Sequence, residues 1–138
     1  MPNNRSMPPG DVIPELAYAD VGAAAAWLCN AFGFAEHLRI ADHRIQMRVG
    51  AGSIVVVGAG AALPAQHAST HAVMVRVADV DAHHLRARDA GARIVTEPQD
   101  HAFGERQYSA LDLAGHRWTF SQTIADIDPA LWGGALVD

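Results

Sequence analysis

Alternating apolar and polar positions change to helical spacing at two places in the chain, and the two places resemble each other. The stretch from Leu16 to Val21 (LAYADV) returns fifty-nine positions later as Val75 to Val80 (VRVADV). The alternation predicts a strand before each aspartate, and the run after it predicts a helix whose first backbone N–H groups the aspartate side chain caps. Asp20 and Asp79 are therefore the expected N-caps.

The pattern predicts the same series of elements in each copy. Helices are expected over 21–32 and 81–90, ended by Gly33 and Gly91. Strands are expected over 11–18, 34–40, 44–49 and 54–57 in the first copy, and over 71–77, 93–96, 106–111 and 117–122 in the second. Matching the turn glycines Gly52 and Gly115 gives an offset of sixty-three, which places four extra residues in the loops of the second copy.

This repetition predicts an α+β fold of two tandem βαβββ modules, 11–58 and 70–124, with curved mixed sheets around a cleft. Chance recurrence of Ala, Val and Asp is the alternative. The modules form a single domain over 11–138, with a C-terminal extension in which Asp128 begins a short helix and Trp132 anchors the tail. Residues 1–10 are polar and proline-rich, and we expect them to be disordered or to lie across the surface.

Composition and charge limit the kinds of partner that the chain can bind. With 138 residues, half of them hydrophobic, the chain can bury a sizeable core. The net charge of −5 and the lack of a basic run argue against nucleic acid. No apolar run approaches the ~20 residues of a membrane span, so we expect no membrane partner. The single cysteine, Cys29, forms no disulfide framework or CxxC motif, and a cytoplasmic location is expected.

Several stretches carry a family resemblance. They are the paired strand–Asp–helix units, the segment from Ala31 to Phe34 (AFGF), and Phe103 to Tyr108 (FGERQY) leading into Asp112 to Phe120 (DLAGHRWTF). Over about residues 11–132 the chain resembles the glyoxalase/bleomycin-resistance proteins of the vicinal oxygen chelate superfamily. The resemblance implies the fold but no single activity, because that superfamily includes isomerases, thiol transferases, ring-cleaving dioxygenases and non-catalytic drug-binding proteins.

The resemblance also implies where a metal would be bound. The enzymes hold a divalent ion through His, Gln or Glu side chains on the first and last strands of each module. Carried over to this chain, those positions are Ile13, Val56, Ala72 and Thr119. None supplies an imidazole or a carboxylate, and a stable divalent site needs several such ligands. We therefore expect no metal and no cofactor.

The alternative to a metal-free protein is one that binds a metal through histidine side chains. A one-residue register slip would turn His71 into the cleft, and an unanticipated set of histidines could still bind a metal. We expect five other histidines, on the second helix or in loops, to be solvated: His67, His83, His84, His101 and His116.

Strand alternation selects the candidate ligand-binding residues. If Leu16 and Tyr18 pack under the first helix, Glu15 points into the cleft, and the same reasoning applied to the other strands directs further side chains inward. The selected set is Glu15, Arg48, Met74, Arg76, Tyr108 and Thr119.

Each member also has a structural interpretation. Glu15 is either a ligand anchor or general base, or a carboxylate neutralised by a nearby arginine. Arg48 and Arg76 are ligand clamps or structural ion-pair residues, and Met74 is a contact or a gap-filler. Tyr108 offers a stacking face for a planar ligand only if its strand directs it into the cleft, and its strand has no clear apolar face.

Three classes of function follow. The favoured class is a metal-free binding protein that encloses a small organic molecule, such as an antibiotic or metabolite, and acts as a homodimer. The second is a metal-dependent lyase, isomerase or dioxygenase. The third is a metal-independent enzyme with Glu15 as its base. Bound metal and sensitivity to chelators distinguish the second class from the others.

Overall fold

A computed structural model describes residues 4–59 and 71–136, so His67 lies outside the described residues. The first module contains β1 (Glu15–Tyr18), α1 (Val21–Phe32), β2 (Ala35–Ile40), β3 (Arg44–Val49) and β4 (Gly52–Gly58). The second contains β5 (Val73–Arg76), α2 (Val80–Asp89), β6 (Arg93–Asp100), β7 (Glu105–Leu111) and β8 (Arg117–Thr123). The short 3-10 helix η2 (Pro129–Leu131) follows.

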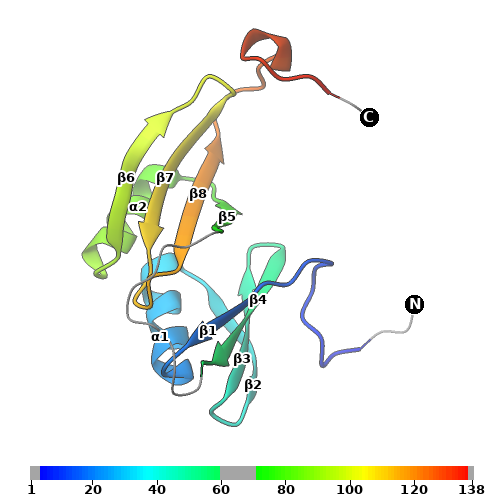
Figure 1. Ribbon diagram of the computed structural model, residues 1–138, viewed down its shortest axis with the longest axis vertical. Helices are drawn as coiled ribbons and strands as arrows, with labels where there is room; N and C mark the ends of the chain where they lie inside the picture. Colours follow the sequence, from blue (N-terminus) through cyan, green and yellow to red (C-terminus); the bar gives the residue numbers. More distant parts are fainter. Residues whose placement is uncertain (1–3, 60–70, 137–138) are drawn as a thin grey trace.

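The two modules have the same topology. One sheet, sheet A, has the strand order β1-β4-β3-β2, and the other, sheet B, has the order β5-β8-β7-β6. In each sheet the first strand pairs in parallel with the last, and the other pairs are antiparallel. Figure 1 shows the two sheets following one another along the long axis of the molecule. The expected α+β fold of two βαβββ modules is confirmed.

The expected helix caps are present at equivalent positions. Asp20 accepts a hydrogen bond from the backbone N–H of Ala23 at 3.0 Å, and Asp79 accepts one from Ala82 at 3.1 Å. Helix α1 ends at Gly33, which adopts a left-handed φ of 78° that a residue without Cβ reaches at little cost.

The core is continuous between the modules. Small side chains on α1 let the helix approach its sheet closely, and Ala24, Ala25 and Leu28 are fully buried there. The rings that end α1 continue into the second module: Phe32 lies 4.8 Å from Phe120, measured between ring centroids. Phe34 lies 5.3 Å from Trp118.

A buried carboxylate joins the modules at their polar contact. Asp112, 6% exposed, lies in the turn between β7 and β8. Its Oδ2 accepts hydrogen bonds from the Tyr18 hydroxyl of β1 at 2.6 Å and from Trp118 Nε1 at 3.0 Å. Its Oδ1 accepts from the backbone N–H groups of Ala114 and His116. Burial and the adjacent Asp112 charge raise the pKa of Tyr18, so its hydroxyl stays protonated and donates.

His116 strengthens the same junction, which corrects the expectation that it is solvated. Its Nε2 lies 2.8 Å from the carbonyl oxygen of Ala17, and its ring packs edge-on against Tyr18. The turn that carries His116 folds against β1 instead of projecting into solvent.

The terminal segments contact the sheets in different ways. The Ser6 carbonyl accepts a hydrogen bond from Gln46, and Pro8 is buried. Asp128 caps η2 as expected, and Trp132 makes an edge contact with Phe103 while remaining 42% exposed. None of the helices in the described part of the chain is long and apolar enough to cross a membrane.

Replacing Asp112 with Asn should destabilise the protein by about 2–4 kcal/mol. An amide cannot accept at both of its polar atoms, so the Tyr18 and Trp118 donors compete with an N–H group in a buried site. Urea unfolding followed by circular dichroism measures the change. The exposed substitution Asp89→Asn is the matched control and should change stability by less than about 0.5 kcal/mol. Equal effects of the two variants would contradict the junction described here.

Candidate functional site

The face of sheet B opposite α2 is polar, and we call it the sheet B open face. Register and alternation place on it side chains from β5, β7 and β8, whereas Trp118 and Phe120 point to the helix. Its members are Met74, Arg76, Glu105, Gln107, Ser109, Thr119 and Ser121.

Hydrogen bonds order this face. The Ser109 and Thr119 hydroxyls lie 2.9 Å apart, and the Ser121 hydroxyl donates to Glu105 Oε1 at 2.6 Å. Hydrogen bonds from Ser121 and Thr123, together with the nearby positive charge of Arg76, hold the pKa of Glu105 below its usual range. Glu105 therefore remains an acceptor at neutral pH.

The corresponding face of sheet A, the sheet A open face, carries Glu15, Arg44, Gln46, Arg48, Ser53 and Val55. Glu15 forms an exposed ion pair with Arg44 at 3.6 Å. The Arg48 Nε donates to His37 Nδ1 at 3.3 Å. The register thus places Glu15 and Arg48 on the face of sheet A opposite α1.

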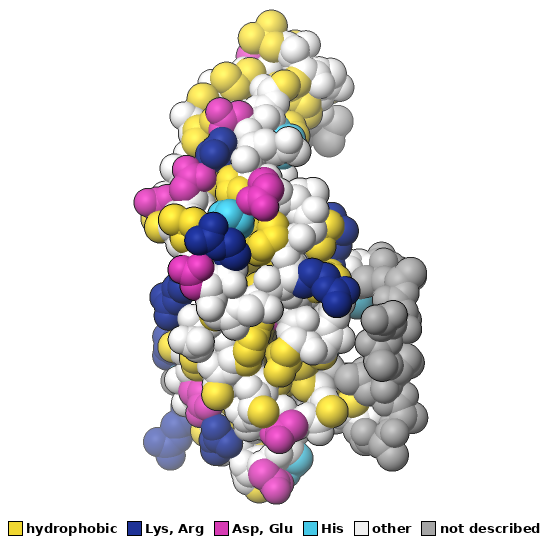
Figure 2. Space-filling view, turned by 90° about the vertical axis from the view of Figure 1, so that its left-hand side faces the viewer, with side chains coloured by type: hydrophobic (Ala, Val, Ile, Leu, Met, Phe, Trp, Pro, Cys, Tyr) yellow, Lys and Arg dark blue, Asp and Glu magenta, His cyan; other side chains and the backbone are white. Residues whose placement is uncertain are grey.

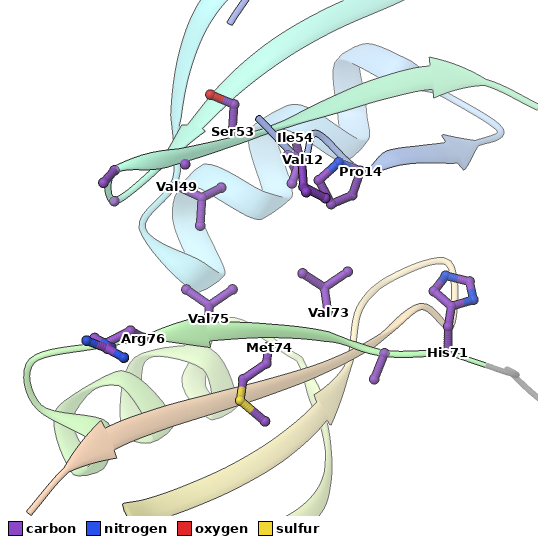
Figure 3. A pocket seen from close by; sticks show the side chains of 14 residues that line it. Val12, Pro14, Val49, Ser53, Ile54, His71, Val73, Met74, Val75 and Arg76 are labelled. Atoms are coloured by element: carbon purple, nitrogen blue, oxygen red, sulfur yellow. The ribbon is translucent and has the colours of Figure 1, made fainter. Parts of the chain in front are cut away.

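The two open faces do not face each other within one chain. In Figure 3, Ser53 of sheet A and Met74 of sheet B point in opposite directions, away from the space between the sheets. Glu15 pairs with Arg44 and not with Arg76. The cleft expected between two facing sheets is therefore not formed by the described residues of a single chain, because the modules are joined through their helix-side cores.

A crevice lies between the modules instead. It has a volume of about 720 Å³ and is lined by residues 49–54, residues 71–76, Val12 and Pro14. Val49, Val73 and Val75 point into it, with Arg76 and His71 at its two ends (Figure 3). Ala72, Met74 and Arg76 also line the crevice. The Met74 side chain, 64% exposed, nevertheless turns to the other face of sheet B.

Tyr108 lies elsewhere, and its expected role as a stacking face in the cleft is wrong. Its ring is fully buried under α2 and stacks on Phe120. Burial raises the pKa of its hydroxyl, which therefore stays protonated. Tyr108 alternates with Gln107 and Ser109, and it is those neighbours that reach the open face.

His83 and His84 correct the expectation of solvated side chains. His84 is 7% exposed, with Nε2 lying 2.8 Å from Glu97 Oε2. His83 bridges the modules: its Nδ1 lies 2.5 Å from the Tyr108 hydroxyl and its Nε2 lies 3.0 Å from the carbonyl oxygen of Phe32. Because that carbonyl can only accept, Nε2 carries the proton and Nδ1 accepts from Tyr108.

The metal positions implied by the family need one correction. Glu15 pairs with Val55 and its counterpart Met74 pairs with Thr119, so the last strands correspond at an offset of sixty-four. Val55, not Val56, is therefore the counterpart of Thr119. Val56 is fully buried on the helix side.

The corrected positions still do not fit a divalent ion. Ile13, Val55, Ala72 and Thr119 provide a single hydroxyl among them, and the Thr119 hydroxyl is already paired with Ser109. In residues 4–59 and 71–136, no group of three or more His, Cys, Asp or Glu side chains could hold a metal ion. His71 lies at one end of the crevice lining.

Charge on the surface is mixed. On the face drawn in Figure 2, acidic and basic side chains lie intermixed along the length of the molecule. The only basic side chains among the fourteen described residues that line the crevice are Arg76 and His71, and these fourteen include no Asp or Glu.

Comparisons with known proteins define the family. The model of the Glyoxalase/Bleomycin resistance protein/Dioxygenase superfamily matches residues 13–120. The chain belongs to this superfamily. The crystal structure of TioX from Micromonospora sp. ML1 is 37% identical, with a TM-score of 0.69, and the match covers 83% of this chain and 98% of TioX.

Other relatives are more distant or match in part. A family enzyme from Burkholderia phytofirmans PsJN is 18% identical with a TM-score of 0.70, covering 80% of this chain and 96% of that one, which shows the fold alone. An uncharacterized protein of Mycobacterium bovis is 36% identical over 56 residues, 41% of this chain. The matched part spans only 37% of that curated relative.

Protonation of His83 should weaken folding at acid pH. Burial, offset in part by the Phe32 carbonyl, lowers the pKa of His83 in the folded protein, whereas in the unfolded chain it is about 6.5. The unfolded state therefore binds the proton first, and this contribution to stability is complete above about pH 6.5 and declines as the pH falls below it. Urea midpoints between pH 8 and pH 5 should fall more steeply for the parent protein than for His83→Gln.

The matched control is His43→Gln, which changes an exposed histidine in the turn between β2 and β3. It should leave the slope of stability against pH as in the parent. A parent and a His83→Gln variant with parallel pH profiles would show that His83 does not couple protonation to folding.

Proposed function

We propose that this member of the superfamily is a metal-free protein that binds and sequesters a small organic molecule, such as an antibiotic or metabolite. The observation that carries the proposal is the crevice between the modules. Its volume of about 720 Å³ lies within the 300–1,000 Å³ typical of small-molecule sites. Val49, Val73 and Val75 offer apolar contacts inside the crevice, and Arg76 at one end supplies a positive charge that can orient a ligand.

The absence of metal-ligating side chains at the implied positions supports binding without a resident metal. An enzyme that uses Glu15 as a base draws no support from the geometry, since Glu15 is 58% exposed and paired with Arg44. A buried carboxyl with a raised pKa is what such a role needs. Thr119, Met74 and Arg48 remain candidates for ligand contact from the open faces.

The proposal includes a homodimer. Open faces that point apart in one chain can face those of a second copy and so complete a cleft.

An apolar anion should bind the crevice and depend on Arg76. The fluorescent probe 8-anilinonaphthalene-1-sulfonate should bind the purified protein, and Arg76→Ala should weaken binding by about 1–3 kcal/mol, the scale of one charge-assisted hydrogen bond. Fluorescence titration gives both dissociation constants. Arg93→Ala removes an exposed arginine at the start of β6 and should leave the affinity unchanged.

A chelator separates this proposal from the metal-dependent alternative. Incubation with EDTA should leave both probe affinity and the thermal midpoint unchanged, because a metal that binds only the folded state would stabilise it measurably. Stoichiometric zinc, nickel, manganese or iron after dialysis would refute the metal-free proposal. Equal probe affinities of Arg76→Ala and the parent would refute the assignment of the crevice.

Sedimentation at micromolar concentration should give a mass about twice 14.7 kDa. Burial of the apolar and polar surface on the two open faces supplies the driving force. A single species at 14.7 kDa over this concentration range would contradict the dimer.

A further inference from the structure

The C-terminal segment 124–136, which we call the C-terminal arm, exposes large apolar side chains. Leu131 and Leu136 are 79% and 81% exposed, and Ile124 and Trp132 are exposed as well. Figure 2 shows hydrophobic side chains gathered at the end of the molecule that carries the arm. Single exposed apolar side chains are common on protein surfaces, whereas a cluster of them marks an interaction site.

Contacts within the arm hold it in one conformation. The Asp128 side chain caps η2, and the Asp128 carbonyl oxygen accepts a hydrogen bond from the Leu131 N–H. The Gly134 N–H donates to the carbonyl oxygen of Pro129. The Trp132 ring lies so close to Gly134 that a Cβ added there would come within 2.7 Å of it. Leu131 is therefore presented on a preformed turn, and docking it requires little further ordering of the chain.

The arm is attached at a part of sheet B that lies away from the crevice. The Gly104 carbonyl oxygen, in the turn between β6 and β7, accepts hydrogen bonds from the N–H groups of Ile124 and Ala125. Trp132 contacts Phe103 in the same turn. Because the strand order is β5-β8-β7-β6, this turn and the crevice residues on β5 lie on opposite sides of β8. None of residues 124–136 lines the crevice, and the arm continues past the end of sheet B (Figure 1).

The crevice and the arm complement each other in polarity and charge. Val73 and Val75 point into the crevice, whose described lining includes Arg76 and no Asp or Glu (Figure 3). The arm contains Asp126 and Asp128 but no Lys, Arg or His. Opposite charges beside two apolar surfaces favour their association in one orientation.

We propose that the C-terminal arm of one chain docks in the crevice of a second copy of this chain. Leu131 enters between the valine side chains, and the acidic residues of the arm lie toward Arg76. Since each chain carries one arm and one crevice, exchange between two copies uses both and closes the assembly. The inference rests on the homodimer of the proposed function, and it gives the crevice a first occupant that a small molecule has to displace.

Disulfide formation between singly substituted chains tests the docking. In a Cys29→Ser background, full-length Leu131→Cys carries a purification tag and Val75→Cys does not. Mixed at micromolar concentration with oxidised glutathione, the two should form a disulfide-linked heterodimer, because such a bond requires Cα atoms within about 7 Å. Asp42→Cys, in the exposed turn between β2 and β3, replaces Val75→Cys as the matched control and should give no heterodimer.

A charge on the arm should weaken the dimer. Leu131→Asp should raise the dimer dissociation constant by about tenfold or more, since a carboxylate would have to enter an apolar crevice. Sedimentation at several protein concentrations measures this constant. Leu85→Asp replaces an exposed leucine of α2 and should leave the constant unchanged.

The arm should also compete with small molecules for the crevice. Leu131→Asp should bind 8-anilinonaphthalene-1-sulfonate several-fold more tightly than the parent, because a larger fraction of the crevices is then open to the probe. Probe binding that depends on Arg76 but is equal in the parent and in Leu131→Asp would refute the docking while leaving the proposed function of the crevice.

Further outcomes would overturn the docking. They are a heterodimer yield no greater with Val75→Cys than with Asp42→Cys, and equal dissociation constants for Leu131→Asp and the parent. A parent protein that is monomeric at micromolar concentration would overturn it together with the proposed homodimer, but not the binding of the probe to the crevice. A disulfide that forms only when Leu131→Cys and Val75→Cys are in the same chain would place the arm over its own crevice instead.

Discussion

The arrangement of the modules depends on the buried Asp112 carboxylate. It belongs to the second module, and it accepts a hydrogen bond from a tyrosine on the first strand of the first module. A carboxylate in this position is tolerated because two side-chain donors and two backbone donors satisfy it. Loss of one partner would leave an uncompensated charge, so the contact admits little variation in how β1 meets the turn between β7 and β8.

A second polar contact acts at the helix ends. Arg86 of α2 donates to the carbonyl oxygens of Cys29 and Asn30 in the last turn of α1, where the Gly33 N–H also donates to the Cys29 carbonyl. His83 donates to the Phe32 carbonyl nearby. The C-terminus of one helix is thus capped by the side chains of the other. Together with Asp112, these contacts direct both helices inward and both open faces outward.

Much of this fold could be predicted from the sequence because it depends on interactions between residues that are close together in the chain. The caps at Asp20 and Asp79 and the alternation that separates Val75 from Arg76 depend on near neighbours, and they were predicted correctly. Tyr108, His83 and His116 were misplaced because their partners lie in the other module or across the sheet. A histidine on a polar helix gives no local sign that a carbonyl from a distant helix will meet it.

The register error at Val56 has a specific cause. The glycines at 52 and 115 look equivalent, but Arg48 pairs with Ser53 across four residues, whereas Leu111, the counterpart of Arg48, pairs with Arg117 across five. The extra length shifts the last strand by one position. Since side chains alternate with a period of two, a shift of one residue exchanges the two faces.

This difference in turn length also accounts for the crevice. When the two modules are matched, Val49 of the first corresponds to Asp112 of the second, and Val77 of the second corresponds to Tyr18 of the first. The pair Val49 and Val77 therefore takes the place of the hydrogen-bonded pair Asp112 and Tyr18. The longer turn brings a carboxylate and a histidine against β1, and the shorter turn, Gly50-Ala51, leaves the space beside β5 open. The crevice thus exists because the two modules differ at this turn. After a duplication, the turn of one module could take on the structural role at the junction. The equivalent turn of the other module could then change under selection without loss of that junction.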